Sequence, residues 1–167
     1  MRKVIACMVL VGSQLVSAQP ALYRGQVLTI PQGAVVDSTG TTYFESIQLQ
    51  ENDAGNFVLV AAEQRSLATV ESLEVQVMES LPLQISVSVT GYTPTPCNEL
   101  LTPAVFYKDN SFTVALAHSE LGPAESCIAV IEPFTTTVPL QVAGLKAGSY
   151  QVSVNGVKTE FTLQVDN

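Results

Sequence analysis

The stretch YQVSVNGVKTEFTLQV, residues 150–165, decides the fold class because apolar and polar residues alternate on both sides of an Asn155-Gly156 pair. Alternation with a period of two is typical of a strand that buries one face. Asn-Gly is the preferred pair for a two-residue type I′ turn, since both central positions need positive φ. The stretch therefore predicts a β-hairpin of two strands, residues 150–154 and 157–165.

The same alternation runs through the second half of the chain. It is strictest at residues 83–90, where every second residue is Leu, Ile or Val. Pro139 predicts an edge or bulged strand around it, because proline cannot donate a hydrogen bond to a ladder. Many short strands separated by turns indicate a sandwich rather than an open sheet. We expect further strands near residues 105–107, 111–117, 127–131 and 134–142.

The first half is also predicted to be β-structure, with strands at residues 27–30, 43–50 and 57–62, the first of them stopped by Pro31. Between the last two lies the polar run ENDAGN, residues 51–56, whose glycine can adopt the positive φ of a short loop. We expect a hairpin here. Calcium bound by carboxylates of this loop is an alternative, but the loop lacks EF-hand spacing.

The segment at residues 63–71 is ambiguous, because its apolar residues fit helical spacing as well as strand alternation. We predict a connector followed by a strand, and we place a domain boundary there. The expected organisation is a signal peptide at residues 1–18, an N-terminal β-module at 19–71 and a β-sandwich domain at 72–167.

Four motifs in the second half resemble one recurring pattern: ESLPLQISVSVTG (79–91), PTPCNE (94–99), CIAVIEPF (127–134) and GLKAGSYQVSVNGVKTEFTL (144–163). Residues 73–167 thereby resemble a secreted bacterial immunoglobulin-like module of no assigned activity, and the preceding residues resemble a short exported β-module. The resemblance implies an immunoglobulin-like sandwich with an N-terminal β-hairpin or meander module. Tyr150 also lies where such sandwiches carry a tyrosine corner. No catalytic residue or ligand comes with the resemblance.

The first residues have the order of a secretory signal. Arg2 and Lys3 precede an apolar run at residues 4–11, and small residues end in Val16-Ser17-Ala18. We expect cleavage after Ala18 and a secreted or periplasmic protein. Lipidation at Cys7 is disfavoured because this cysteine precedes most of the apolar run. No later run reaches the roughly 20 residues that span a bilayer, so no membrane insertion is expected after cleavage.

Charge argues against two classes of partner. The chain has 15 acidic and 7 basic residues and a net charge of −8, and cleavage of the signal would remove two of the bases. Nucleic acids and anionic membrane surfaces should therefore repel the protein. We expect a protein partner, if there is a partner, and no nucleic acid.

The cysteines predict one disulfide. The chain has three, and Cys7 leaves with the signal, so Cys97 and Cys127 remain in a compartment where thiols oxidise. Closing this loop should contribute about 3.5 kcal/mol in the chain-entropy model. A zinc site is the competing interpretation, but CxxC spacing is absent and there is one histidine.

Motifs for catalysis are missing. The single histidine, His118, is expected at a strand end or on the surface rather than as a general base. There is no GxSxG, HExxH, P-loop or GxGxxG motif. We therefore predict no enzyme, no cofactor and no metal. A hydrolase using paired carboxylates is the weakest alternative, because the number of acidic residues alone selects no pair.

The candidate binding loop is GYTPTPCNELLTP, residues 91–103, which three prolines and a cysteine should stiffen. We take Tyr92, Asn98 and Glu99 as candidate binding residues, since rigid loops lose less entropy on binding. A crossover that binds nothing is the alternative. We predict a secreted non-enzymatic binding or structural module that acts through protein contacts. An immunoglobulin-like protease inhibitor is the second candidate, because residues 90–92 match the TGY of an NPTTGY-type inhibitory loop.

Overall fold

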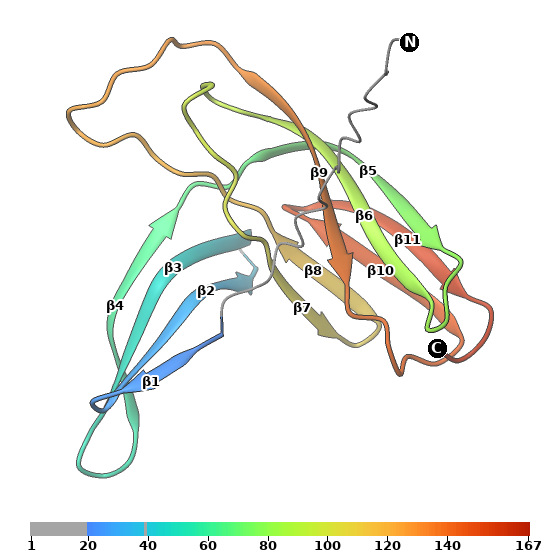
Figure 1. Cartoon of the computed structure of the whole chain (residues 1–167), viewed down its shortest axis with the longest axis horizontal. Helices are drawn as coiled ribbons and strands as arrows, with labels where there is room; N and C mark the ends of the chain where they lie inside the picture. Colours follow the sequence, from blue (N-terminus) through green and yellow to red (C-terminus); the bar gives the residue numbers. More distant parts are fainter. Residues whose placement is uncertain (1–19, 39) are drawn as a thin grey trace, which may run out of the picture.

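The computed structural model describes residues 20–38 and 40–167, and the predicted signal peptide lies outside them. The described residues form eleven strands in three sheets, with no helix among them (Figure 1). This part of the chain accordingly contains no helix that could cross a bilayer. The predicted all-β fold class is confirmed.

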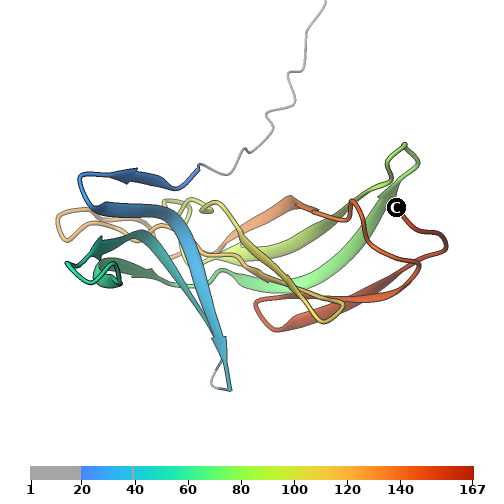
Figure 2. The same ribbon diagram turned by 90° about the horizontal axis from the view of Figure 1, so that it is seen from below.

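The second half of the chain forms a sandwich of two sheets (Figure 2). Alternating apolar side chains from both sheets make one core, in which Val87, Val114 and Val152 have no exposed surface. One sheet has the order β5-β6-β9, from β5 (Thr69–Met78), β6 (Gln84–Thr93) and β9 (Glu132–Leu140). The other has the order β11-β10-β8-β7, from β7 (Ala104–Lys108), β8 (Ser111–Ala115), β10 (Gly148–Val154) and β11 (Val157–Leu163).

The hairpin at residues 150–165 forms as predicted. Strands β10 and β11 are antiparallel with Tyr150 opposite Phe161, and the turn residues Asn155 and Gly156 have φ of 47° and 93°. The Tyr150 hydroxyl donates to the carbonyl of Lys146 at 2.6 Å, which is the hydrogen bond of a tyrosine corner. The expectation of an immunoglobulin-like sandwich is consistent with this arrangement.

The pairing of β8 with β10 is parallel, whereas the sheets of an immunoglobulin sandwich are antiparallel. Val152 lies opposite Phe112 and Val154 opposite Val114. Strand alternation reports which face is buried and carries no information about direction. The parallel pair was therefore outside what the sequence pattern could predict.

One predicted strand, residues 127–131, is wrong, because these residues are irregular and β9 begins at Glu132. The reason is the length of the neighbouring strand. The ladder between β6 and β9 starts at Thr93 opposite Glu132, and β6 ends at Thr93. Residues before Glu132 thus have no strand to pair with. The same ladder places Pro139 on a strand at the edge of its sheet, as predicted.

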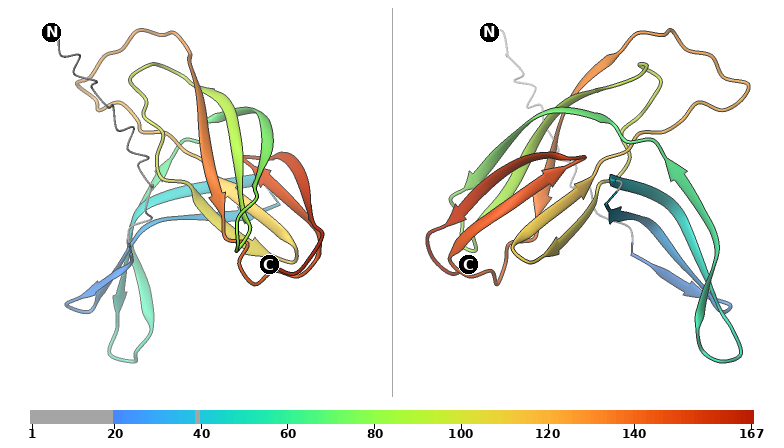
Figure 3. Two further views of the ribbon diagram at one scale, coloured as in Figure 1. Left: turned by 45° about the vertical axis from the view of Figure 1, so that its right-hand side comes forward. Right: turned by 180° about the vertical axis from the view of Figure 1, so that it is seen from behind.

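The N-terminal sheet is a single antiparallel layer in the order β1-β2-β3-β4 (Figure 3). Its strands are β1 (Leu22–Arg24), β2 (Val27–Asp37), β3 (Gly40–Glu51) and β4 (Phe57–Arg65). The predicted hairpin of residues 43–50 with 57–62 is present as β3 and β4. The prediction that Pro31 stops the first strand is wrong. Strand β1 covers β2 only as far as Thr29, so the missing N–H of Pro31 faces a free edge.

The connector between the N-terminal sheet and the sandwich is short, since β4 ends at Arg65 and β5 begins at Thr69. Leu67 forms a bridge with Ala117, and the Ala68 amide donates to the carbonyl of Leu116 at 2.9 Å. The connector is therefore bonded to the sandwich along its length. The predicted boundary after residue 71 falls inside β5, and the division of the chain into two folding units stays a prediction.

Tyr43 is the main contact of the N-terminal sheet with the sandwich. Its side chain is fully buried against Ala104, Ala115 and Ala117. Its hydroxyl donates to the carbonyl of Thr102 at 2.8 Å. Burial raises the pKa of Tyr43 to about 12. Tyr43 therefore anchors the N-terminal sheet to the sandwich, together with the partly buried Ala34 of β2.

Candidate functional site

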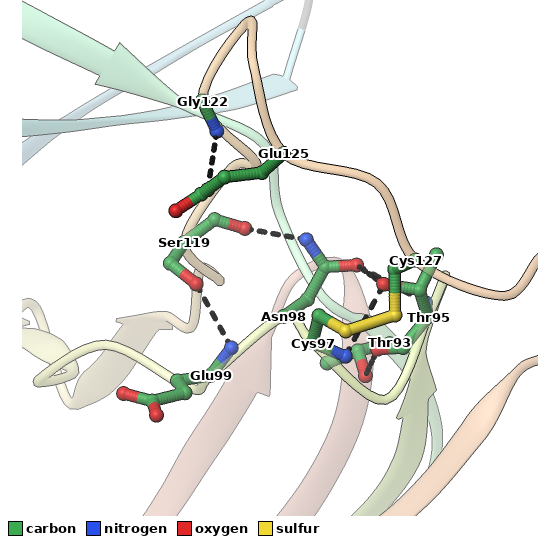
Figure 4. The surroundings of a disulfide bond; sticks show 9 residues. All are labelled: Thr93, Thr95, Cys97, Asn98, Glu99, Ser119, Gly122, Glu125 and Cys127. Atoms are coloured by element: carbon green, nitrogen blue, oxygen red, sulfur yellow. Dashed lines mark hydrogen bonds between the residues drawn. A yellow bond between two sulfur atoms is a disulfide. The ribbon is translucent and has the colours of Figure 1, made fainter.

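Two irregular segments at one end of the sandwich, residues 94–103 and 119–131, form what we call the end-loop pair (Figure 4). A disulfide between Cys97 and Cys127 joins them, with the two Cα atoms 6.2 Å apart. The pairing predicted from the cysteine count is therefore present. Each loop is also tied to the other by the hydrogen bonds around Asn98 and Ser119 (Figure 4).

Both polar atoms of the Asn98 side-chain amide form hydrogen bonds within the end-loop pair. Its Oδ1 accepts hydrogen bonds from the Thr95 amide at 3.1 Å and the Thr95 hydroxyl at 2.7 Å. Its Nδ2 donates to the carbonyl of Ser119 at 2.7 Å. A ligand would have to displace these bonds, so the geometry gives Asn98 a structural role.

Glu99 is held through its backbone. Its amide donates to the Ser119 hydroxyl at 2.9 Å, and its carbonyl accepts from the Ser119 amide at 2.8 Å. The residue as a whole is exposed. Of the three candidate binding residues, Glu99 is the one that the structure leaves on the surface of the loop.

Tyr92 is not part of a loop, because β6 continues to Thr93 and pairs Tyr92 with Thr69 on one side and Pro133 on the other. The neighbouring Gly91 is packed so closely that an added Cβ would lie 2.0 Å from the carbonyl oxygen of Thr69. The TGY sequence at residues 90–92 thus belongs to a central strand. It does not form the inserting loop that a protease inhibitor requires.

His118 is buried, with 5% of its surface exposed, which corrects the alternative of a surface histidine. Its amide donates to the carbonyl of Ser66 at 3.0 Å, and its ring Nδ1 donates to the carbonyl of Ser119 at 2.8 Å. The ring therefore helps to orient the residue that holds both Asn98 and Glu99. These contacts place His118 in the support of the end-loop pair.

The start of the second loop is fixed by Glu120. Its carboxylate accepts a hydrogen bond from the Ser66 hydroxyl at 2.7 Å, and this bond lowers the pKa of Glu120. Further along, the Glu125 carboxylate accepts from the Gly122 amide at 2.7 Å and closes a turn. The loop is consequently tied at its start to the connector and in its middle to itself.

The exposed large hydrophobic side chains of the end-loop pair follow Cys127. Ile128, Val130 and Ile131, which we call the aliphatic run, have 66%, 57% and 57% of their surface exposed. Sequence reasoning missed them because their apolar character predicted a buried strand. The signal that could have found them is their position next to a disulfide and before a PF dipeptide, outside any alternating stretch.

A groove of about 850 Å³ opens along the side of the sandwich where β7 and β9 are both edge strands. Its lining includes Phe112, Leu116 and Val138 from the core as well as residues 100–103 of the first loop. The two sheets are therefore not closed over each other on this side. The first loop lines part of the opening.

The predicted turn at residues 51–56 is formed by its own hydrogen bonds. Asn52 Oδ1 accepts from the amides of Ala54 and Asn56, both at 3.0 Å, and Gly55 has φ of 77°. Glu51 accepts a hydrogen bond from the Tyr23 hydroxyl. Within residues 20–38 and 40–167, no three His, Cys, Asp or Glu side chains are clustered as metal ligands.

The comparison with protein families bears on the sandwich alone. Residues 87–163 match the ORF11 beta-sandwich domain. The match begins inside β6, ends at the last residue of β11 and includes both loops of the end-loop pair. The chain matches no curated protein and no solved structure. The match supports a β-sandwich module and gives no activity.

Proposed function

We propose that this protein is a secreted, non-enzymatic bacterial module with an immunoglobulin-like sandwich, and that it binds another protein through the aliphatic run. One observation carries the proposal. Three large aliphatic side chains are more than half exposed on a loop that a disulfide fixes to a hydrogen-bonded partner loop. Exposed apolar groups that cluster in this way are typical of interaction sites.

The chemistry of the aliphatic run favours an apolar pocket on the partner. Full burial of a valine or isoleucine side chain stabilises a complex by about 1.5–3 kcal/mol. The disulfide and the bonds of Asn98 keep the loops ordered before binding, so less conformational entropy is lost when a partner binds. The acidic balance of the chain argues against nucleic acid as that partner.

Export is supported by two features. The first eighteen residues have the order of a cleavable signal. Disulfides persist in oxidising compartments and are rare in the cytosol. If the signal is cleaved as proposed, N-terminal sequencing of the secreted or periplasmic protein will begin at Gln19. Recovery of full-length chain in the inner membrane would contradict export.

The binding proposal is tested with the mature protein immobilised against the exported fraction of the producing cells. The test variant is Ile128→Ser/Val130→Ser/Ile131→Ser. The control is Val77→Ser/Leu81→Ser/Val165→Ser, which removes three aliphatic side chains that are also exposed, at 54%, 101% and 73%. We expect the affinity of the test variant for its partner to fall about tenfold or more, a change of roughly 1.4 kcal/mol in binding free energy. The control should bind the partner as the wild type does. Equal recovery with both variants would refute the proposal.

A further inference from the structure

The two sheets of the sandwich have different numbers of strands, and this leaves one strand position open. A sheet of four strands faces a sheet of three. Strands β5 and β11 lie side by side and close one side of the sandwich, whereas β9 and β7 are the edges on the other side (Figure 1). The groove of about 850 Å³ opens between these two edges. The open position therefore lies beside β9 and faces β7.

The exposed side chains of β7 show what is missing from this position. Val105 lies opposite Val114 of β8, and Tyr107 lies opposite Phe112. Because opposite residues point to the same face of a sheet, Val105 and Tyr107 point into the sandwich. Their partners in β8 are buried, but Val105 and Tyr107 are 37% and 43% exposed. Two side chains that face the core thus lack a cover from the opposite sheet.

The free edge of β9 has the backbone groups to hold a further strand. The ladder between β6 and β9 runs without a bulge, and Pro133 and Pro139 are an even number of residues apart. Alternate residues of a strand direct their N–H and C=O groups to the same side, and prolines are tolerated where the N–H would face a free edge. Thr135 and Thr137 share this alternation and should therefore present N–H and C=O groups to the open position. The two prolines limit pairing to residues 134–138, so a short segment fits.

The chemistry of the groove selects an uncharged segment. Among the described residues that line the groove, none is charged, although the chain has a net charge of −8. The lining includes the core residues Phe112, Leu116 and Val138. A charged side chain placed against them would lose water without gaining a partner. The segment that fits is therefore a strand whose inward side chains are apolar.

The described part of this chain has no segment to donate to the groove of a second copy. All eleven strands are already paired in sheets. The aliphatic run is unpaired, but it is held at one end by the disulfide of Cys127 and at the other by β9, which begins at Glu132. The stretch 128–131 between these anchors is shorter than residues 134–138, with which it would have to pair. The segment should accordingly come from a different protein.

We propose that the groove is a docking site for one extended, uncharged segment of another protein, which adds to β9 as the fourth strand of its sheet. Every second side chain of this segment packs on Val105 and Tyr107, and its backbone bonds to Thr135 and Thr137. In this mode of recognition, main-chain hydrogen bonds supply affinity and side-chain pockets supply specificity. The groove is distinct from the aliphatic run, and the inference goes beyond the proposed function.

A peptide with the proposed pattern tests the groove. The probe is acetylated TVTVTVTK with a dye on its lysine, and its fluorescence anisotropy is measured against the mature protein. The control peptide TVTVPVTK keeps the valines, but its proline interrupts the strand. We expect a dissociation constant of about 100 μM for the probe and binding at least about tenfold weaker for the control. Val105→Glu places a charge in the groove and should weaken probe binding about tenfold or more. Val77→Glu, at an exposed valine of β5, should bind the probe as the wild type does.

A tethered strand keeps the test decisive if the free peptide binds weakly. The Asn167 side chain donates to the carbonyl of Val142 at 3.1 Å, which places residue 167 near the end of β9. TVTVTVT joined to residue 167 by about six Gly and Ser residues can thus return along β9 and antiparallel to it. We expect this tether to raise the melting temperature by about 4 °C or more. Tethered TVTVPVT should not raise it, and neither strand should raise that of Val105→Glu.

Absence of both peptide binding and a rise in melting temperature would overturn the proposal, and so would equal effects of the two strands or undiminished binding by Val105→Glu. Self-association of the protein without peptide, abolished by Val105→Glu in sedimentation, would assign the groove to a second copy and would also overturn it. The serine variant of the aliphatic run should still bind the probe. Val105→Glu should still retain the partner of the aliphatic run, so each proposal fails separately.

Discussion

The N-terminal sheet and the sandwich are built from similar sequences but bury very different amounts of surface. Both have alternating apolar residues and a tight hairpin turn. In the sandwich, the two facing sheets bury alternate apolar side chains in one core, whereas Tyr43 is the one apolar residue of strands β1 to β4 that is fully buried. Alternation therefore predicts a strand, while a second layer decides whether the strand contributes a core.

The largest expected difference is between two phenylalanines. Phe112 in β8 is 1% exposed and Phe57 in β4 is 47% exposed. Phe112→Ala should lower the free energy of unfolding by about 3–5 kcal/mol because it leaves a cavity, and Phe57→Ala by less than about 1 kcal/mol. Urea denaturation of the two variants measures this. Similar losses would mean that the N-terminal sheet packs against something that the isolated chain does not show.

The disulfide should stabilise the sandwich. Replacing Cys97 and Cys127 by serine removes the link between the loops, and we expect a loss of about 2–4 kcal/mol from the greater entropy of the unfolded chain. Thermal unfolding of the oxidised wild type and the double variant gives the difference. Labelling of both cysteines by a thiol reagent in native, non-reduced protein would show that the bond is absent.

The two regions can also be compared through one turn asparagine in each, Asn155 in the sandwich and Asn52 in the N-terminal sheet. Asn155 accepts from the Leu116 amide and donates to the carbonyls of Leu116 and Ala68, at 2.7–2.9 Å. Asn155→Ala should cost about 2–3 kcal/mol, since it removes the partner of the Leu116 amide and of the Ala68 carbonyl and one of the two bonds of the Leu116 carbonyl. Asn52 closes an exposed turn with two bonds, so Asn52→Ala should cost about 1 kcal/mol or less. Equal losses in chemical denaturation would contradict this ranking.

The smallest effect concerns the contact between the two regions. The pKa of Tyr43 is raised from 10.0 to about 12 by burial. A raised pKa means that the folded state holds the proton more tightly, so this contribution is complete below pH 10 and is lost as pH rises through about 12. Tyr43→Phe should lose about 1 kcal/mol from the missing bond to Thr102. Its stability should also fall less steeply than that of the wild type between pH 10 and 12, as measured by denaturation at each pH.

Local signals predicted much of this fold. The Asn155-Gly156 turn, the hairpin of residues 43–62 and the edge position of Pro139 each follow from a rule that involves neighbouring residues only. The failures involve partners far away in the chain. Residues 127–131 are apolar enough for a strand, but β6 ends before it could pair with them. The parallel direction of β8 and β10 likewise depends on how the chain crosses between sheets.

The candidate site shows the same division. The pairing of Cys97 with Cys127 followed from counting cysteines, but the role of Asn98 did not follow from its loop. Its Nδ2 bonds to Ser119, twenty-one residues further along the chain. Tyr92 was assigned to a loop because prolines follow it closely, whereas the ladder with β5 and β9 holds it in a strand. The aliphatic run is exposed because β6 ends at Thr93, so no strand pairs with residues 127–131. The end of a distant strand cannot be predicted from the run itself.

The bonded connector between β4 and β5 also determines how the two regions present their surfaces. Since Leu67 and Ala68 are bonded to the segment around Ala117, the N-terminal sheet and the end-loop pair of one molecule keep a set relation to each other. A partner that contacts both would find them at one spacing and in one orientation. Binding to one surface would then hold the other at a high effective concentration, so the two contacts together would have a higher avidity than either alone.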